Sequence, residues 1–157
     1  PLLHDGVGLY RSRDRGENWE FLNASQRFLY PKDFAVHPDD SNRILVGTCD
    51  TSWDHKTGGL YETQNGGGDW KRIGRQGRQT FGGYYHPNRP GWIYMTLTEG
   101  APEAGLWLSR NGGSDWQPFN GLPFSNIQRV VFDRENENAI YVTTFGGSVW
   151  HGPAVPQ

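Results

Sequence analysis

The chain has almost no cysteine, no long hydrophobic run and no excess of either charge, and each absence excludes a class of protein. Cys49 is the single cysteine among 157 residues, so no internal disulfide and no cysteine-rich metal site can form. The net charge is −2 at pH 7, which indicates neither a nucleic acid nor an anionic membrane surface as partner. No apolar run approaches the roughly 18 residues that a membrane-inserted helix needs. No motif indicates a cofactor or a metal ion.

Glycine and aromatic residues are plentiful instead. The sequence contains 22 glycines, and aromatic residues make up 14 % of it. This composition is typical of a fold with many turns and much aromatic packing. No segment shows sustained apolar spacing at the helical period. We therefore predict an all-β fold with little helix.

A Gly-rich segment that ends in tryptophan occurs three times. The copies are SRDRGENW (12–19), TQNGGGDW (63–70) and SRNGGSDW (109–116), and their tryptophans lie 51 and 46 residues apart. These spacings are typical of one four-stranded propeller blade. Before each copy lies a strand-like run that begins with glycine, and further upstream two apolar runs flank a polar turn. Each repeat therefore predicts four strands, A to D, with the Gly-rich segment between C and D.

The three segments resemble the Asp-box (BNR-repeat) pattern, Ser/Thr-x-Asp-x-Gly-x-Thr-Trp, of a β-propeller family. That family includes sialidases, xyloglucanase-like glycoside hydrolases and sortilin-like receptors. The resemblance implies a β-propeller of four-stranded antiparallel blades, in which the boxes are structural. Their residues are Ser12, Asp14, Gly16, Trp19, Thr63, Asn65, Gly67, Trp70, Ser109, Asn111, Gly113 and Trp116.

Each box position has an expected task in the turn between strands C and D. The short side chain at the third position can accept hydrogen bonds from turn amides. The glycine supplies a positive φ, and the tryptophan can pack its indole against the blade and cover the turn. Asn65 and Asn111 replace the aspartate that Asp14 keeps. The threonine before the tryptophan is absent from all three copies.

Counting strands predicts a single propeller segment with about three blades' worth of strands. Residues 28–73 and 79–119 form whole blades in this reading, and residues 1–27 and 127–152 form partial ones. Propellers usually close with about four to eight blades, and joining the two ends would give five strands where a blade takes four. We therefore expect the chain to be part of a larger propeller, completed by remaining blades of a longer chain or by another subunit.

The loops at the end opposite the boxes are predicted to bind ligand, because loops of variable length are where function is usually carried. A tryptophan beside acidic and basic side chains in the loop 49–58 offers an apolar platform and directional hydrogen bonds for a sugar. The predicted ligand-binding residues are Asp50, Trp53, His55, Arg75, Arg78 and Tyr30. His37 and His86, each followed by proline, are predicted to share a structural role at the box end.

A glycoside hydrolase would need two carboxyl groups about 5–5.5 Å or about 6.5–9.5 Å apart. Asp54 and Glu99 are the predicted catalytic pair, with Asp33, Asp50 and Glu103 as further candidates. The sequence favours a carbohydrate-related propeller, either glycoside hydrolase-like or polysaccharide-binding, whose partner is a glycan and whose location is extracellular or periplasmic. A non-catalytic propeller that binds or assembles proteins is the alternative, and whether the chain is an enzyme stays open.

Overall fold

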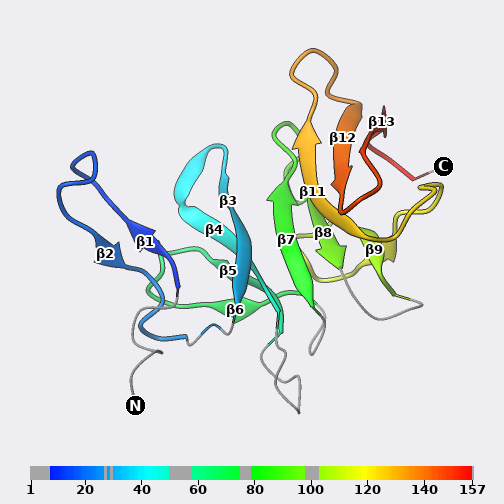
Figure 1. Ribbon diagram of the computed structural model, residues 1–157. Coiled ribbons are helices and arrows are strands. Elements are labelled where there is room, and N and C mark those ends of the chain that lie inside the picture. The colour runs from blue at the N-terminus through cyan, green and yellow to red at the C-terminus, as the bar shows by residue number, and fades with distance from the viewer. Residues whose placement is uncertain are drawn as a thin grey trace.

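The computed structural model describes residues 8–26, 28, 30–49, 58–74, 79–97 and 103–156. These residues form thirteen strands and no helix, arranged in four separate antiparallel sheets (Figure 1). The predicted all-β class is therefore confirmed. Within the described residues there is accordingly no helix that could cross a membrane.

Neighbouring strands in each sheet are also consecutive in the chain. Sheet 1 contains β1 (Tyr10–Arg11) and β2 (Glu20–Phe21). Sheet 2 contains β3 (Pro31–His37), β4 (Asp40–Thr48), β5 (Gly59–Thr63) and β6 (Lys71–Arg72). Sheet 3 contains β7 (Thr80–Tyr85), β8 (Ile93–Leu97), β9 (Gly105–Ser109) and β10 (Gln117–Pro118). Sheet 4 contains β11 (Ile127–Phe132), β12 (Ala139–Thr144) and β13 (Val149–Pro153).

The first strands of sheets 2, 3 and 4 pack against one another, β3 on β7 and β7 on β11. These three strands run in one direction, and the strands that follow them, β4, β8 and β12, run back (Figure 1). In the view of Figure 1, the turns from β1 to β2, from β3 to β4 and from β11 to β12 all lie at the upper end. We call this the box end, and the opposite end of the sheets the loop end.

Apolar layers fill the spaces between consecutive sheets. Successive side chains on a strand point to opposite faces of the sheet, so Ile44 and Val46 pack toward sheet 1 while Leu45 packs toward sheet 3. The same alternation on β8 sends Ile93 toward sheet 2 and Tyr94 toward sheet 4. Each such side chain contributes about 1.5–3 kcal/mol when fully buried. The layers, rather than the short ladders of β1, β6 and β10, hold the sheets together.

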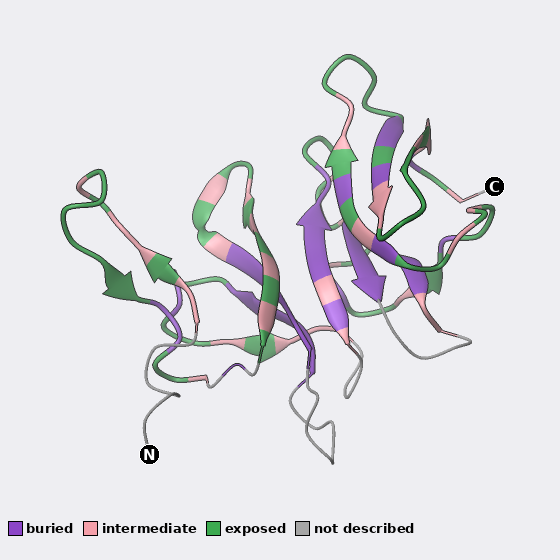
Figure 2. Cartoon of the chain, viewed as in Figure 1, coloured by how far each residue is buried: buried purple, intermediate pink, exposed green. Residues whose placement is uncertain are grey.

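The two outermost faces are not covered by another sheet among the described residues. Figure 2 shows sheet 3 mostly buried and the strands of sheet 1 mostly exposed. On the outer face of sheet 4, Val131, Tyr141 and Val149 are exposed. Tyr10, Trp19 and Phe21 are exposed on sheet 1.

Candidate functional site

The three box turns are built from one set of hydrogen bonds. In each box the hydroxyl at the first position accepts from the glycine N–H at the fifth, and the side-chain oxygen at the third accepts from the N–H at the seventh. The first bond measures 2.6 Å (Gly16 to Ser12), 2.9 Å (Gly67 to Thr63) and 2.8 Å (Gly113 to Ser109). The second measures 2.9 Å in all three boxes (Asn18 to Asp14, Asp69 to Asn65, Asp115 to Asn111). The polar side chains at these positions are thus engaged in holding the turn.

The third and seventh positions of each box also pair one amide with one carboxylate. The Asn18 amide donates to Asp14 in the first box. In the other two boxes the order is reversed, and the amides of Asn65 and Asn111 donate to Asp69 and Asp115. In these two boxes the amide therefore stands at the third position, where aspartate is usual, and the acid at the seventh, where threonine is usual.

Asp14 is strongly biased toward its charged form. The backbone N–H of Asn18, then its side-chain amide, then the Ser12 hydroxyl lower the pKa of Asp14 from 3.8 to about 2. Hydrogen bonds to a carboxylate favour the ionised state. Asn65 and Asn111, at the same position in the other boxes, do not titrate.

The second and third box tryptophans connect consecutive sheets. The indole N–H of Trp70 donates to the backbone carbonyl of Leu22, just after β2, at 3.1 Å. The indole N–H of Trp116 donates to the carbonyl of Ile73, just after β6, at 2.8 Å. The sequence predicts the packing of each indole over its own turn, but the bond to the preceding sheet depends on how the sheets stack.

Two acidic side chains on the strands, Asp33 and Glu62, are bonded to residues of neighbouring sheets. We call each such set of hydrogen bonds and ion pairs between sheets a tie. Asp33 on β3 accepts from the Tyr84 hydroxyl at 2.8 Å and from two nitrogens of Arg129 at 2.8 and 3.1 Å. This tie connects sheets 2, 3 and 4. Burial, and then the Asp33 carboxylate, raise the pKa of the Tyr84 phenol. With both carboxylate oxygens occupied, Asp33 is poorly suited to the role of catalytic acid or base.

Glu62 forms the second tie, on the side of sheet 2 that faces sheet 3. Its side chain is 5 % exposed and accepts from Arg43 at 2.7 Å and from the Tyr85 hydroxyl at 2.8 Å. A buried carboxylate needs such charged and polar partners. The sequence pattern alone gave no reason to single out this residue.

Most of the predicted ligand-binding and catalytic residues lie outside the described residues. These are Asp50, Trp53, Asp54, His55, Arg75, Arg78 and Glu99. Tyr30 is described, and its exposed ring lies just before β3, where the backbone has a φ of 48°. Its carbonyl accepts from the N–H of Cys49 at 3.1 Å. Among the site residues predicted from sequence, the structure therefore places Tyr30, the boxes and two of the further candidate acids, Asp33 and Glu103.

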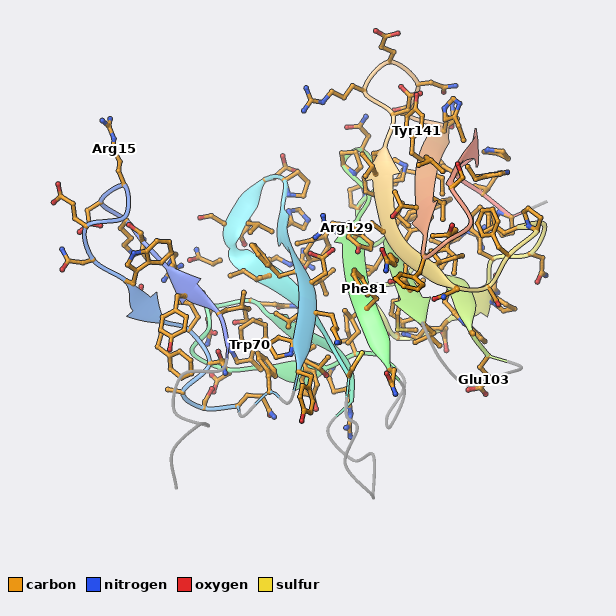
Figure 3. The ribbon with its side chains drawn as sticks, in the orientation of Figure 1. Arg15, Trp70, Phe81, Glu103, Arg129 and Tyr141 are labelled. Carbon is orange, nitrogen blue, oxygen red and sulfur yellow. The ribbon has the colours of Figure 1, made fainter. Side chains whose placement is uncertain are left out.

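A pocket of about 410 Å³ lies between the start of β9 and the segment that follows β10. Its lining includes a carboxylic acid, an amide and three aromatic side chains, namely Glu103, Asn120, Trp107, Phe119 and Phe124. Figure 3 labels Glu103 at the loop end of sheet 3 and Arg15 of the first box at the opposite end. The loop end was predicted to bind ligand, and Glu103 was among the candidate acids. Asn120 was missed, because nothing in its local sequence distinguishes it from an ordinary turn residue.

The two histidines before proline form equivalent turns at the box end. The ring Nδ1 of His37 accepts from the N–H of Asp39 at 3.2 Å, and that of His86 accepts from Asn88 at 3.1 Å. Burial lowers the pKa of His86. In the described part of the chain, no group of three or more acidic, histidine or cysteine side chains is arranged to hold a metal ion.

The sequence Asn23-Ala24-Ser25 matches the signal for N-glycosylation, but in the structure the Asn23 side chain forms hydrogen bonds within the chain. Asn23 is buried; its side-chain oxygen accepts from the N–H of Leu9 at 2.8 Å, and its amide donates to the carbonyl of Gln26 at 3.0 Å. A glycan is carried on that amide nitrogen. A glycan on that nitrogen would not fit the buried position of Asn23 in the folded chain.

Comparison with solved structures shows which fold this arrangement of sheets belongs to. No protein-family model and no curated protein matches the sequence. Three GH74 enzymes match the structure over 92 % of this chain. An ancestral enzyme has 26 % sequence identity and a TM-score of 0.66, and an enzyme from Niastella koreensis has 18 % identity and a TM-score of 0.70. A xyloglucanase from Xanthomonas campestris has 16 % identity and a TM-score of 0.66. The chain is a β-propeller segment of four-stranded antiparallel blades. It spans 20 %, 24 % and 25 % of the length of those three chains, respectively.

Proposed function

We propose that this chain belongs to a carbohydrate-active β-propeller and binds polysaccharide at its loop end. The observation that carries the proposal is the similarity over 92 % of the chain to GH74 enzymes, one of which is a xyloglucanase. A β-glucan of the xyloglucan type is therefore the substrate class that we propose. A location outside the cytoplasm, where such a polymer would be met, is part of the same proposal.

The pocket near Glu103 supplies chemistry that suits a sugar. Aromatic rings such as Phe124 offer a flat apolar surface for the C–H face of a pyranose. The Asn120 amide can donate to and accept from hydroxyl groups. The Glu103 carboxylate can accept a hydrogen bond from a sugar hydroxyl. Ligand binding by the predicted residues of the loops 49–58 and 75–78 would extend this surface along the loop end.

Hydrolysis would require two carboxyl groups on either side of the scissile bond. Asp54 and Glu99 remain the proposed pair. Glu103 lies four residues after Glu99 in the chain and is the described acid nearest to that pair in sequence. Asp33 is set aside because Tyr84 and Arg129 already occupy both of its oxygens.

The test is calorimetric titration of the chain with a xyloglucan oligosaccharide. Phe124→Ala and Trp53→Ala are each expected to weaken binding about tenfold, which corresponds to the loss of about 1.4 kcal/mol of contact energy. Arg15→Ala, at the box end, is the matched control and should leave the affinity unchanged. No binding, or equal affinity for all variants, would contradict the proposal.

Turnover separates the enzyme from the binding module. If Asp54 is catalytic, Asp54→Ala should abolish release of reducing sugar and largely spare binding. In a non-catalytic propeller, Asp54→Ala has no effect on binding and no turnover is detected for any variant.

A further inference from the structure

Two arginines share one tryptophan ring at the box end of sheet 3. The guanidinium carbon of Arg89, in the turn from β7 to β8, lies 4.5 Å from the centre of the Trp92 ring, and that of Arg110, just after β9, lies 5.0 Å from it. The two positive charges are therefore no farther apart than about 10 Å, which is the screening length in 0.1 M salt. Both also act on the buried Tyr94: burial raises the pKa of its phenol, and the two arginines oppose that rise. We call Arg89 and Arg110 the arginine pair.

Each arginine of the pair is oriented by a neutral side chain. Arg89 donates to the amide oxygen of Asn138, and Arg110 donates to that of Gln117 at 3.1 Å. Among the described residues, no carboxylate forms an ion pair with either arginine. Four other arginines do have such a partner: Arg11, Arg13, Arg43 and Arg129. The amides thus fix the arginine pair without neutralising it, and each guanidinium keeps further N–H donors because an arginine has five.

The acidic side chains near the pair are bonded to amides as well. Glu137, in the turn from β11 to β12, accepts from the amide of Asn88 at 3.2 Å. Asp115 accepts from the amide of Asn111 in the third box at 2.8 Å. The positive charge of the pair is therefore left available to a group from outside.

The fold does not require the arginine pair. Sheet 2 forms the same turn from its first to its second strand, and in both sheets a carbonyl of that turn accepts from the N–H of a box glycine at 2.8 Å. The residues that take the places of Arg89, Trp92 and Arg110 in sheet 2 are Asp40, Arg43 and Gln64. The same turn and box thus form with other side chains at these positions.

A pocket of about 150 Å³ adjoins Arg110. Its lining also includes Leu108, Asn111, Asp115 and Gln117. A protein cavity of about this volume holds one six-membered ring. Leu108 supplies an apolar wall, the Gln117 amide can donate to a hydroxyl group, and the Asp115 carboxylate can accept from one. The pocket and the arginine pair together suit a ring that carries hydroxyl groups and one anionic group.

We propose that the arginine pair and this pocket bind a uronic acid residue of an acidic polysaccharide. The planar carboxylate of the sugar matches the fork of N–H donors on a guanidinium, and its pyranose ring occupies the pocket beside Arg110. An acidic peptide also offers carboxylates, but its acidic side chains have no ring to fill the pocket. The site lies at the end of the sheets opposite to the proposed xyloglucan surface and does not depend on that proposal.

The experiment is calorimetric titration of the 157-residue chain with trigalacturonate. We expect binding that weakens as the salt concentration rises, and no binding of the same trimer after methyl esterification of its carboxylates. Arg89→Gln and Arg110→Gln should each weaken binding at least about tenfold, because each removes hydrogen bonds between two charged groups. Gln64 stands at the place of Arg110 in sheet 2, so glutamine is compatible with the turn.

Arg13→Gln is the matched control. Arg13 has the same position in the first box as Arg110 in the third, but it pairs with Glu20. Its replacement should leave the affinity for trigalacturonate unchanged, and circular dichroism should show that all three variants are folded.

Three results would overturn the proposal: no binding of trigalacturonate, the same affinity in Arg110→Gln as in the unchanged chain, or equally tight binding of triglutamate at the same salt concentration. The last result would make the site one for acidic peptides. A neutral xyloglucan oligosaccharide separates this proposal from the proposed function, because Arg110→Gln should not change the affinity for it. Failure of that oligosaccharide to bind would contradict the proposed function and leave the trigalacturonate result standing.

Discussion

Gly67 and Gly16 occupy the same position in two boxes, but alanine should be far more costly at Gly67. Both glycines have a positive φ, 101° at Gly67 and 98° at Gly16, and an L-residue in left-handed backbone costs about 1–2 kcal/mol. At Gly67 the new methyl group would also lie 2.3 Å from the backbone oxygen of Leu22. Separating the two sheets to relieve such overpacking adds about 1–3 kcal/mol. We expect Gly67→Ala to lower the free energy of unfolding by about 2–5 kcal/mol, and Gly16→Ala by only about 1–2 kcal/mol.

Urea denaturation followed by far-UV circular dichroism measures both variants in the same chain. The comparison requires an unchanged slope with denaturant, so that a shift of the midpoint reports stability. Gly113→Ala, whose methyl group would lie 2.9 Å from the Ile73 side chain, should fall between the other two because a side chain yields more easily than backbone. Equal losses for Gly67→Ala and Gly16→Ala would refute the argument that the box glycine is selected by contact between sheets.

Three further predictions concern the box acids, the box tryptophans and the tie between sheets. The pKa of Asp14 is below its ordinary value in the folded chain. Asp14 therefore contributes stability that is complete above pH about 4 and is lost as the pH falls toward 2. In Asp14→Asn, the decrease in the free energy of unfolding between pH 5 and pH 2 should be smaller than in the unchanged chain. Trp116→Phe should destabilise the chain by about 1–3 kcal/mol by leaving a carbonyl of sheet 2 without its donor, whereas Trp19→Phe should change stability by less than about 0.5 kcal/mol in thermal unfolding. Arg129→Met removes the partly exposed ion pair with Asp33 and should cost about 1 kcal/mol, a loss that shrinks in 0.5 M salt if the pair acts electrostatically.

The fold could be predicted because its signals are local and repeated. The glycine that opens each third strand is visible in the sequence, and β5 and β9 begin at Gly59 and Gly105. The bonds within each box were also within reach of sequence reasoning, because donor and acceptor lie four residues apart. A regular repeat converts such short-range information into a whole architecture.

The ties between sheets could not be predicted in the same way. Asp33 and Arg129 are 96 residues apart, and the sequence around either residue does not indicate that the two form an ion pair. The same limit applies to the indole of Trp70, whose acceptor is 48 residues away. Sequence reasoning could name the acidic residues of the candidate site, but only the stacking of sheets showed that Asp33 is already used.

The exchange of acid and amide within the boxes has a consequence for how such repeats are recognised. The same two positions are hydrogen-bonded with the acid first, as in Asp14 and Asn18, or with the amide first, as in Asn65 and Asp69. A search pattern that demands aspartate at the third position would reject two of the three copies in this chain. A pattern that asks for one acid and one amide at the third and seventh positions, in either order, accepts all three.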